Sequence, residues 1–275
     1  MSDVQARDLN VSYERRGRLG LIRLERPDAL NALTLGMIGE VERLARAAEA
    51  DPEVTAICIT GAGRGFCAGI DMSVLTDHAS NGPPPRVKPS GARPRPAMFS
   101  FLLDISKPVI AAVNGVGAGG GFVLAMMCDL RFMAEGATLI TIFSRRGLIA
   151  EHGTSWLLPR MIGLSRALDL LWSSRKVDAA EAYRIGLADR VAPADQLLDA
   201  VEAYVADLAA TVSPRAMAAI KAQVHRHLET AFDPAALDSE ALMVTALKHP
   251  DATEGAVSFV ERRPARFAAW TGEEG

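Results

Sequence analysis

The 275-residue sequence is poor in several features that would place it in a specialised class of protein. It has three cysteines, with neither a CxxC pair nor Cys/His ligand spacing, so the sequence indicates neither a metal site nor a disulfide framework. It has no run of about 18 uncharged apolar residues, and residues 1–20 lack the apolar core of a signal peptide. The formal net charge of −3 excludes a global basic field that would recruit nucleic acid. We therefore expect no metal, no membrane association, no nucleic-acid partner and a reducing, cytoplasmic location.

Apolar residues, by contrast, make up 49% of the chain, which is enough for the core of one large domain, with or without an appendage. A helix is predicted over 34–51, with Thr34 as its N-cap. Strand patterns alternate with helical ones, which predicts an α/β fold with mostly parallel pairing. The strand-bearing stretches are 19–27, 54–65, 108–130, 130–135 and 188–193, the last two expected to be buried.

Two stretches differ from this pattern. Residues 76–97 are rich in Pro, Gly and Arg without a hydrophobic period, which predicts a mobile surface loop. From residue 194 onward the pattern is helical, with prolines near helix starts at 214, 234 and 250. The predicted organisation is an α/β core over 1–193 and a helical C-terminal segment over 194–275.

Two glycine loops follow predicted strands. Residues 60–65, TGAGRG, resemble a nucleotide loop, and Gly115, Gly117 and Gly120 fit G-x-G-x-x-G. Three observations count against dinucleotide binding. Both loops are internal, no tyrosine is followed by lysine four residues later, and the shared plan of the loops suggests one shared task.

The two glycine loops could share the task of presenting backbone N–H groups to one ligand. Glycine lets a ligand approach the backbone closely, so N–H groups from the two loops can converge on one oxygen as an oxyanion hole. The alternative is that the glycines only allow tight turns and close packing. The residues alone leave both interpretations open.

Several motifs together resemble the crotonase superfamily, also called the enoyl-CoA hydratase/isomerase family, in family order over nearly the whole chain. They are RPDALNAL (26–33), ITGAGRGFCAGIDM (59–72), PVIAAVNGVGAGGGF (108–122), RGLIAEHGTSWLLPRMIG (146–163), DAAEAYRIGLADRV (178–191) and EGAVSFVERRPARF (254–267).

This resemblance implies a crotonase-like spiral of repeated ββα units with a helical C-terminal oligomerisation segment, assembled into trimers or hexamers. It implies a CoA thioester substrate whose carbonyl oxygen is held by the N–H groups of Ile70 and Gly120. It implies no cofactor beyond the coenzyme A of the substrate. The other residues assigned to the substrate site are Ala29, Leu30, Ala68, Gly69, Asp71, Phe143, Phe259 and Arg262. The last two match positions that reach the CoA of a neighbouring subunit. Within this set, Asp71 is expected to fix the oxyanion loop by accepting backbone hydrogen bonds.

The sequence departs from the hydratase pattern at both positions that carry water-activating glutamates in the family. Val123 and Phe143 stand there, and neither side chain can transfer a proton or orient water. Glu151 resembles the position of the single catalytic carboxylate in several isomerases of the family. An N-cap or first-turn role for Glu151 at a helix starting near Gly153 is the alternative. His152 is expected to orient Glu151, to bind substrate or to lie at the surface.

We therefore predict an acyl-CoA enzyme that stabilises an enolate, with Glu151 as proton shuttle, double-bond isomerisation favoured and hydration possible. A second hypothesis keeps the scaffold but assigns C–C hydrolysis, decarboxylation or dehalogenation of an acyl-CoA or β-diketone. A third is a non-catalytic relative that binds acyl-CoA or RNA.

Overall fold

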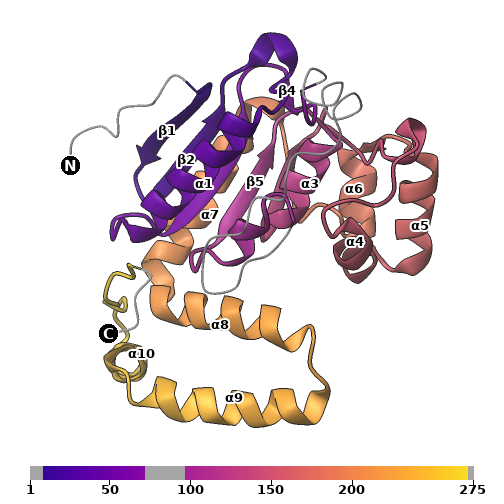
Figure 1. The fold of residues 1–275 in the computed structure, drawn as a ribbon. Helices are drawn as coiled ribbons and strands as arrows, with labels where there is room; N and C mark the ends of the chain where they lie inside the picture. Colours follow the sequence, from indigo (N-terminus) through magenta and orange to yellow (C-terminus); the bar gives the residue numbers. More distant parts are fainter. Residues whose placement is uncertain (1–8, 72–96, 272–275) are drawn as a thin grey trace.

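The computed structural model describes residues 9–71 and 97–271, and every structural statement below concerns those residues. The expected α/β fold is confirmed, and it is built on two β-sheets (Figure 1). The six-stranded sheet has the order β1 (Val11–Arg16), β2 (Leu19–Leu24), β3 (Ala56–Gly61), β5 (Val109–Val113), β7 (Leu130–Ala134) and β10 (Arg190–Ala192). The four-stranded sheet has the order β4 (Gly65–Cys67), β6 (Val116–Ala118), β8 (Thr138–Ile140) and β9 (Val177–Asp178).

From β3 to β8, consecutive strands alternate between the two sheets. In the pairs β3/β4, β5/β6 and β7/β8, the first strand joins the large sheet and the second joins the small one. The pairing from β2 to β10 is parallel throughout, and only β1 is antiparallel to its neighbour in the large sheet. Within the described residues, a helix follows each of the last two pairs, α3 (Gly120–Met127) and α4 (Thr154–Ile162), in line with the ββα units that the family resemblance implied. They place the ends of neighbouring parallel strands at one edge, where both glycine loops lie.

Helices cover both faces of the large sheet. Every residue of β3 and β5 is buried, and successive side chains of a strand point to opposite faces, so neither face is open to solvent. Figure 1 shows α1 (Leu35–Ala50) in front of this sheet and α7 (Leu197–Thr211) behind it. The core is a continuous apolar cluster that includes residues of the sheets and of both helices.

Helix α1 shows how local chemistry sets an element's bounds. Its N-cap is Thr34, as predicted, and the Thr34 hydroxyl accepts a hydrogen bond from the backbone N–H of Met37. At the other end, the buried Lys107 ammonium donates to the carbonyl oxygens of Ala48, at 3.1 Å, and Asp51, at 2.6 Å. A cation on the last carbonyl groups satisfies acceptors that the helix leaves unpaired.

Two sequence expectations about strands were wrong in detail. The stretch 188–193 contains β10, which was expected to be buried. The first two residues of the strand, Arg190 and Val191, are exposed, because β10 is an edge strand that pairs with β7 only. The glycine loops are also not simple loops. Each is followed by or contains a short strand, β4 or β6. A strand of three residues that includes a glycine is too short to show the alternation of apolar and polar residues by which strands are predicted.

The remaining helices follow in chain order. They are α3 (Gly120–Met127), α4 (Thr154–Ile162), α5 (Leu164–Ser173), α6 (Ala179–Ile185), α8 (Pro214–His227), α9 (Phe232–Leu247) and α10 (Pro250–Glu261), with short 3-10 turns η1 (Pro27–Ala29), η2 (Ser100–Leu103), η3 (Ser144–Arg146) and η4 (Ala194–Gln196). Pro214 and Pro250 occupy first-turn positions of α8 and α10, as predicted. Within the described ranges, no helix is both long and apolar enough to cross a membrane.

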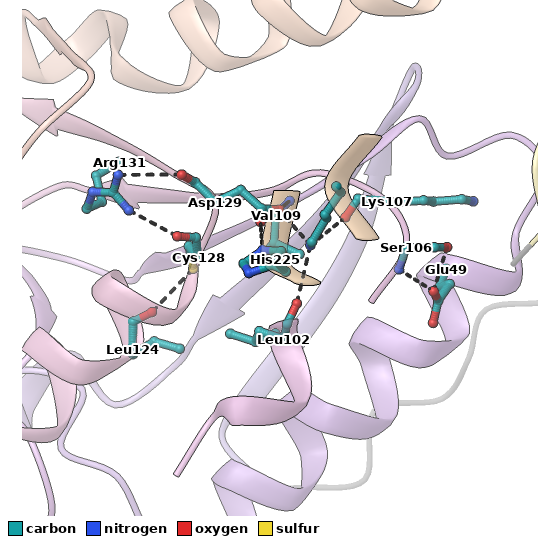
Figure 2. Close-up of polar contacts among 11 residues, drawn as sticks. Glu49, Leu102, Ser106, Lys107, Val109, Leu124, Cys128, Asp129, Arg131 and His225 are labelled. Atoms are coloured by element: carbon teal, nitrogen blue, oxygen red, sulfur yellow. Dashed lines mark hydrogen bonds and ion pairs between the residues drawn. The ribbon is translucent and has the colours of Figure 1, made fainter. Parts of the chain in front are cut away.

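Helices α8, α9 and α10 form an arm that extends away from the core (Figure 1). Lys221 of α8 attaches this arm to the core. Its ammonium lies 2.7 Å from Asp129 Oδ2 and donates to the carbonyl oxygens of Leu102 and Lys107. Asp129 Oδ2 also accepts from the N–H of Val109, the first residue of β5 (Figure 2). The predicted mobile loop falls, except for Ala97, outside the described residues.

Candidate active site

The two glycine loops meet beside the short parallel bridge between Leu33 and Ile70. The N–H of Leu33 donates to Gly69 O at 2.7 Å, and the N–H of Asp71 donates to Leu33 O at 2.9 Å. In a trans peptide, the N–H points opposite to the carbonyl of the preceding residue, and no peptide here is cis. Because Gly69 O faces Leu33, the N–H of Ile70 points away from Leu33 and is left for another acceptor.

The second N–H belongs to Gly120, the first residue of α3. Its N–H has no acceptor inside the helix, as is true of every first-turn donor. A Cβ placed on Gly120 would lie 3.4 Å from the nitrogen of Ile70, and one placed on Gly69 would lie 3.3 Å from the nitrogen of Gly120. The two donors are therefore close neighbours, and the start of α3 adds its positive dipole end.

The glycines of these loops do not all serve close packing. A Cβ on Gly121 would lie 2.0 Å from Cys67 O, and one on Gly115 would lie 2.1 Å from Arg64 O, so these two glycines serve close packing of the backbone. At Gly120 the nearest atoms are 3.4 Å away, which is ordinary contact. Packing alone does not require glycine at position 120.

Two side-chain amides, the buried Asn31 and the partly buried Asn114, hold the loops in place. Asn31, in the left-handed region at φ 58°, accepts from the N–H of Arg26 and donates to Ala62 O and Gly65 O. Asn114 accepts from the N–H of Gly61 and donates to the carbonyl oxygens of Gly63 and Gly65. These contacts fix the segment that contains the predicted CoA-binding residues Ala29 and Leu30. The N–H of Ala68 also donates to Leu30 O at 2.9 Å.

Asp71 follows Ile70 directly and its carboxylate forms an ion pair with Arg26 at 2.8 Å. The ion pair ties the Asp71 side chain to the guanidinium of Arg26, and its expected role as an acceptor of backbone hydrogen bonds stays a prediction. The same Arg26 nitrogen donates to Ala32 O at 2.6 Å. The ion pair with Asp71 and the hydrogen bond to Ala32 O were not predicted for Arg26, because an isolated arginine before a proline carries no sequence signal.

The two positions where the family has glutamates are apolar and closed to water. Val123 lies in α3 with no exposed surface, and Phe143 precedes η3 with 3% exposed surface. Cys67 is also fully buried, and burial raises the pKa of its thiol to about 12. A thiol with that pKa is protonated at neutral pH and is not a nucleophile.

Glu151 lies at the entrance to α4, which packs against α3. The N-cap of α4 is Gly153, and the first turn of this helix contains no acidic residue, so the proposed capping role for Glu151 was wrong. Its backbone carbonyl accepts from the N–H and the hydroxyl of Thr154. The side chain is half-buried, and within the described ranges no hydrogen bond or ion pair holds its carboxylate. Ile149 is 81% exposed and so does not line an apolar pocket around it.

His152 adopts a left-handed backbone conformation at φ 51°. Its Nδ1 accepts a hydrogen bond from the N–H of Met98 at 3.2 Å, which requires an unprotonated Nδ1. Burial lowers the pKa of His152, and the neighbouring Glu151 opposes this shift. The imidazole therefore anchors the chain just before α4 to residue 98. Of the three roles considered for His152, a free surface position was wrong.

Phe259 and Arg262 are not brought to this site within one chain. Both lie at the C-terminal end of α10 on the arm, where Phe259 is 85% exposed and Arg262 ends the helix in a left-handed conformation. Figure 1 shows α10 well separated from α3 and α4. No cluster of three or more metal-ligating side chains was found in the described part of the chain.

Two strand-end loops that present neighbouring N–H groups are an arrangement suited to stabilising a developing oxyanion, as acyl transfer and enolate chemistry require. Residues 14–270 match the family model described as enoyl-CoA hydratase/isomerase. The chain is 36% identical to a probable enoyl-CoA hydratase of Mycobacterium tuberculosis, over 94% of this chain and 97% of that one. It is 32% identical to a crotonyl-CoA hydratase of Syntrophomonas wolfei, over 94% and 97%.

Solved structures agree with these matches. An enoyl-CoA hydratase from Mycobacterium tuberculosis superposes with a TM-score of 0.84 at 28% identity, over 95% of this chain and 99% of that one. A probable enoyl-CoA hydratase/isomerase from Mycobacterium abscessus gives a TM-score of 0.83 at 29% identity, over 94% and 98%. The chain belongs to the enoyl-CoA hydratase/isomerase family, as its motifs indicated.

Proposed function

We propose that this family member catalyses double-bond isomerisation of an enoyl-CoA, with hydration as a slower activity. The N–H groups of Ile70 and Gly120 hold the thioester oxygen. The Glu151 carboxylate takes a proton from C2 of a 3-enoyl-CoA, and the electron pair of that C–H bond passes into a dienolate whose charge rests on the thioester oxygen. Glu151 then returns the same proton to C4, which leaves the double bond between C2 and C3. The proposed chemistry uses no cofactor besides the coenzyme A of the substrate.

The observation that carries this proposal is the pair of buried apolar residues, Val123 and Phe143. Hydration needs groups that orient and activate water, and neither side chain can do so. Isomerisation moves one proton within one molecule and needs one carboxylate. Glu151 is half-buried at the entrance to a helix that packs against α3, which supports this assignment.

The test compares wild type with Glu151→Gln in two assays. One follows conversion of 3-enoyl-CoA to 2-enoyl-CoA, and the other follows loss of 2-enoyl-CoA absorbance by hydration. We expect isomerisation to fall about 100-fold or more in the variant, with CoA binding intact. Asp178→Asn is the control, since Asp178 caps the exposed start of α6. Fast hydration that survives Glu151→Gln contradicts the assignment. No turnover by wild type favours C–C hydrolysis, decarboxylation, dehalogenation or a non-catalytic role.

We further propose that the protein works as a trimer or hexamer in which Phe259 and Arg262 reach the CoA bound by a neighbouring copy. The support is the unpartnered apolar surface of the arm, where the most exposed side chains are Phe232, Phe259 and Val260. Sedimentation equilibrium of the full chain tests this proposal, and a monomer at the assay concentration contradicts it. The cytoplasmic location stays a prediction.

A further inference from the structure

Arg26 lies where the segment around Leu33 meets the loop that presents the Ile70 N–H. Its Nη1 donates to Ala32 O at 2.6 Å and lies 2.8 Å from Asp71 Oδ2. Both side chains of this ion pair are mostly buried, with 25% of the Arg26 and 21% of the Asp71 side-chain surface exposed. One nitrogen therefore ties the residue before Leu33 to the residue after Ile70.

These contacts enclose the Leu33–Ile70 bridge. Leu33 is bonded to the residues on either side of Ile70, through Gly69 O and the N–H of Asp71. The peptide that carries the Ile70 N–H is the same rigid plane that carries Gly69 O. A shift of the bridge rotates this plane and moves the direction of the N–H. The direction of a donor at a developing charge decides how well it stabilises that charge.

We propose that Arg26 is a positioning residue for the oxyanion hole, which it aligns by joining Ala32 O to the Asp71 carboxylate across the Leu33–Ile70 bridge. This inference rests on the proposed function, because it requires that Ile70 and Gly120 hold a thioester oxygen. Arg26 itself contacts neither substrate nor reacting atoms in this assignment. It acts through the backbone of residues 69–71.

The charge of Arg26 has a second effect at this place. The Asp71 carboxylate follows Ile70 directly, so loss of the Arg26 guanidinium would leave its negative charge less compensated, close to the oxygen on which the enolate charge develops. Like charges at such separations repel appreciably in a partly buried site. Arg26 offsets this repulsion. Removal of Arg26 alone is therefore expected to lower kcat more than removal of both the Arg26 and the Asp71 charge.

The variants follow from these two effects. Arg26→Met removes the ion pair and leaves the Asp71 charge. Arg26→Lys keeps the positive charge, and Arg26→Met with Asp71→Asn removes both charges. The matched control is Arg175→Met, because Arg175 forms ion pairs with Asp169 and Glu181 on α5 and α6, outside the site.

The main readout is the absorbance of bound 2,4-hexadienoyl-CoA, a conjugated thioester whose band moves to longer wavelength when its carbonyl is polarised. It needs no turnover. We expect the shift seen with wild type to be largely lost in Arg26→Met, recovered in Arg26→Lys, partly recovered in the double variant and unchanged in Arg175→Met. In the isomerase assay we expect kcat to fall about 10- to 100-fold in Arg26→Met, with KM changed by less than about threefold.

An unchanged band shift and kcat in a folded Arg26→Met overturn the proposal, as does an equal loss in Arg175→Met. Should Arg26→Met fail to fold, Arg26→Gln takes its place, with the same expected loss and the same overturning result. A wild-type band shift without isomerisation contradicts the proposed function but leaves the role of Arg26 decided by the variants. A wild type that binds the thioester without any band shift overturns the oxyanion hole and this inference with it.

Discussion

The side-chain amides of Asn31 and Asn114 donate to the same acceptor, the carbonyl oxygen of Gly65, at 2.8 and 3.2 Å. The two residues come from segments that are far apart in the sequence, one before α1 and one between β5 and β6. Together they hold the β3–β4 connection from both sides. The loop that leads to Ile70 therefore takes its position from these two side-chain amides as well as from its glycines.

Replacement of Asn31 by leucine is expected to lower the free energy of unfolding by about 2–4 kcal/mol, because it leaves the N–H of Arg26 and the oxygens of Ala62 and Gly65 without this partner in a fully buried place. Urea denaturation measures the change. Asn114→Leu is the comparison, and we expect a smaller loss because Asn114 is only partly buried. A loss below about 0.5 kcal/mol for Asn31→Leu would contradict the buried network.

The neighbouring glycines 120 and 121 are expected to respond oppositely to alanine. In Gly120→Ala the added methyl finds ordinary contact distances but lies against the Ile70 nitrogen, so the fold should persist while kcat/KM falls about 10-fold or more. In Gly121→Ala the methyl would lie 2.0 Å from Cys67 O, so the protein should lose stability outright. Thermal melting and the isomerase assay on both variants check this. Full activity in Gly120→Ala would argue against an oxyanion hole formed by the N–H groups of Ile70 and Gly120.

His152 should make the protein less stable as the pH falls. Burial lowers its pKa in the folded state below the ordinary value of 6.5. Just below pH 6.5 the unfolded chain takes up a proton that the folded chain does not, so stability falls with decreasing pH until the folded pKa is reached. Urea denaturation of wild type and His152→Gln between pH 5 and 7.5 tests this. The stability of wild type should decline more than that of the variant, and parallel curves would rule out the predicted linkage.

Lys221 and Asp129 should decide how firmly the arm is attached to the core. Burial raises the pKa of Asp129, but its contacts with His225, Lys221 and the Val109 N–H outweigh this effect and lower the pKa below 3.8. The ionised Asp129 carboxylate therefore contributes to the free energy of unfolding above pH 3.8, and this contribution is lost as the pH falls through the lower pKa of the folded state. Lys221→Met leaves a buried carboxylate with fewer partners and should cost about 3–5 kcal/mol.

Hydrogen–deuterium exchange locates the Lys221→Met effect. Exchange in α8 should accelerate more than exchange in α1, whose last carbonyl oxygens accept from the Lys107 ammonium and not from Lys221. Uniform acceleration across the chain would show that the ion pair supports the whole fold and not the arm in particular.

Much of this fold was predictable from the sequence because its signals are local. The period of α1, its Thr34 cap and the prolines at the helix starts depend on neighbours within a few residues. The motifs around Ile70 and Gly120 also identified the loops that meet. The contacts of Arg26, Asn31 and Asn114 escaped prediction because each joins segments whose proximity only the folded chain defines. Of the two asparagines only Asn114 carried a sequence signal, because it stands directly before the turn glycine Gly115.

The exposure of β10 escaped prediction for a related reason. An apolar side chain carries the same sequence signal whether its neighbours cover it or leave it open. Which strand becomes the sheet edge depends on the order in which all strands pair, and that order is set by the whole chain. The same limit applies to Phe259, whose expected contact lies in another copy of the chain.

The alternation of consecutive strands between two sheets has a consequence for how the chain can be divided. Neither sheet corresponds to a continuous stretch of sequence, so a fragment that stops after β5 or β7 takes strands from both. We expect the described residues 9–71 and 97–192 to unfold in one cooperative transition, and we expect no cut within either range to release a half that keeps its own hydrophobic core. Evolutionary or engineered insertions are then best tolerated at the ends of the ββα turns, where no strand pairing is interrupted.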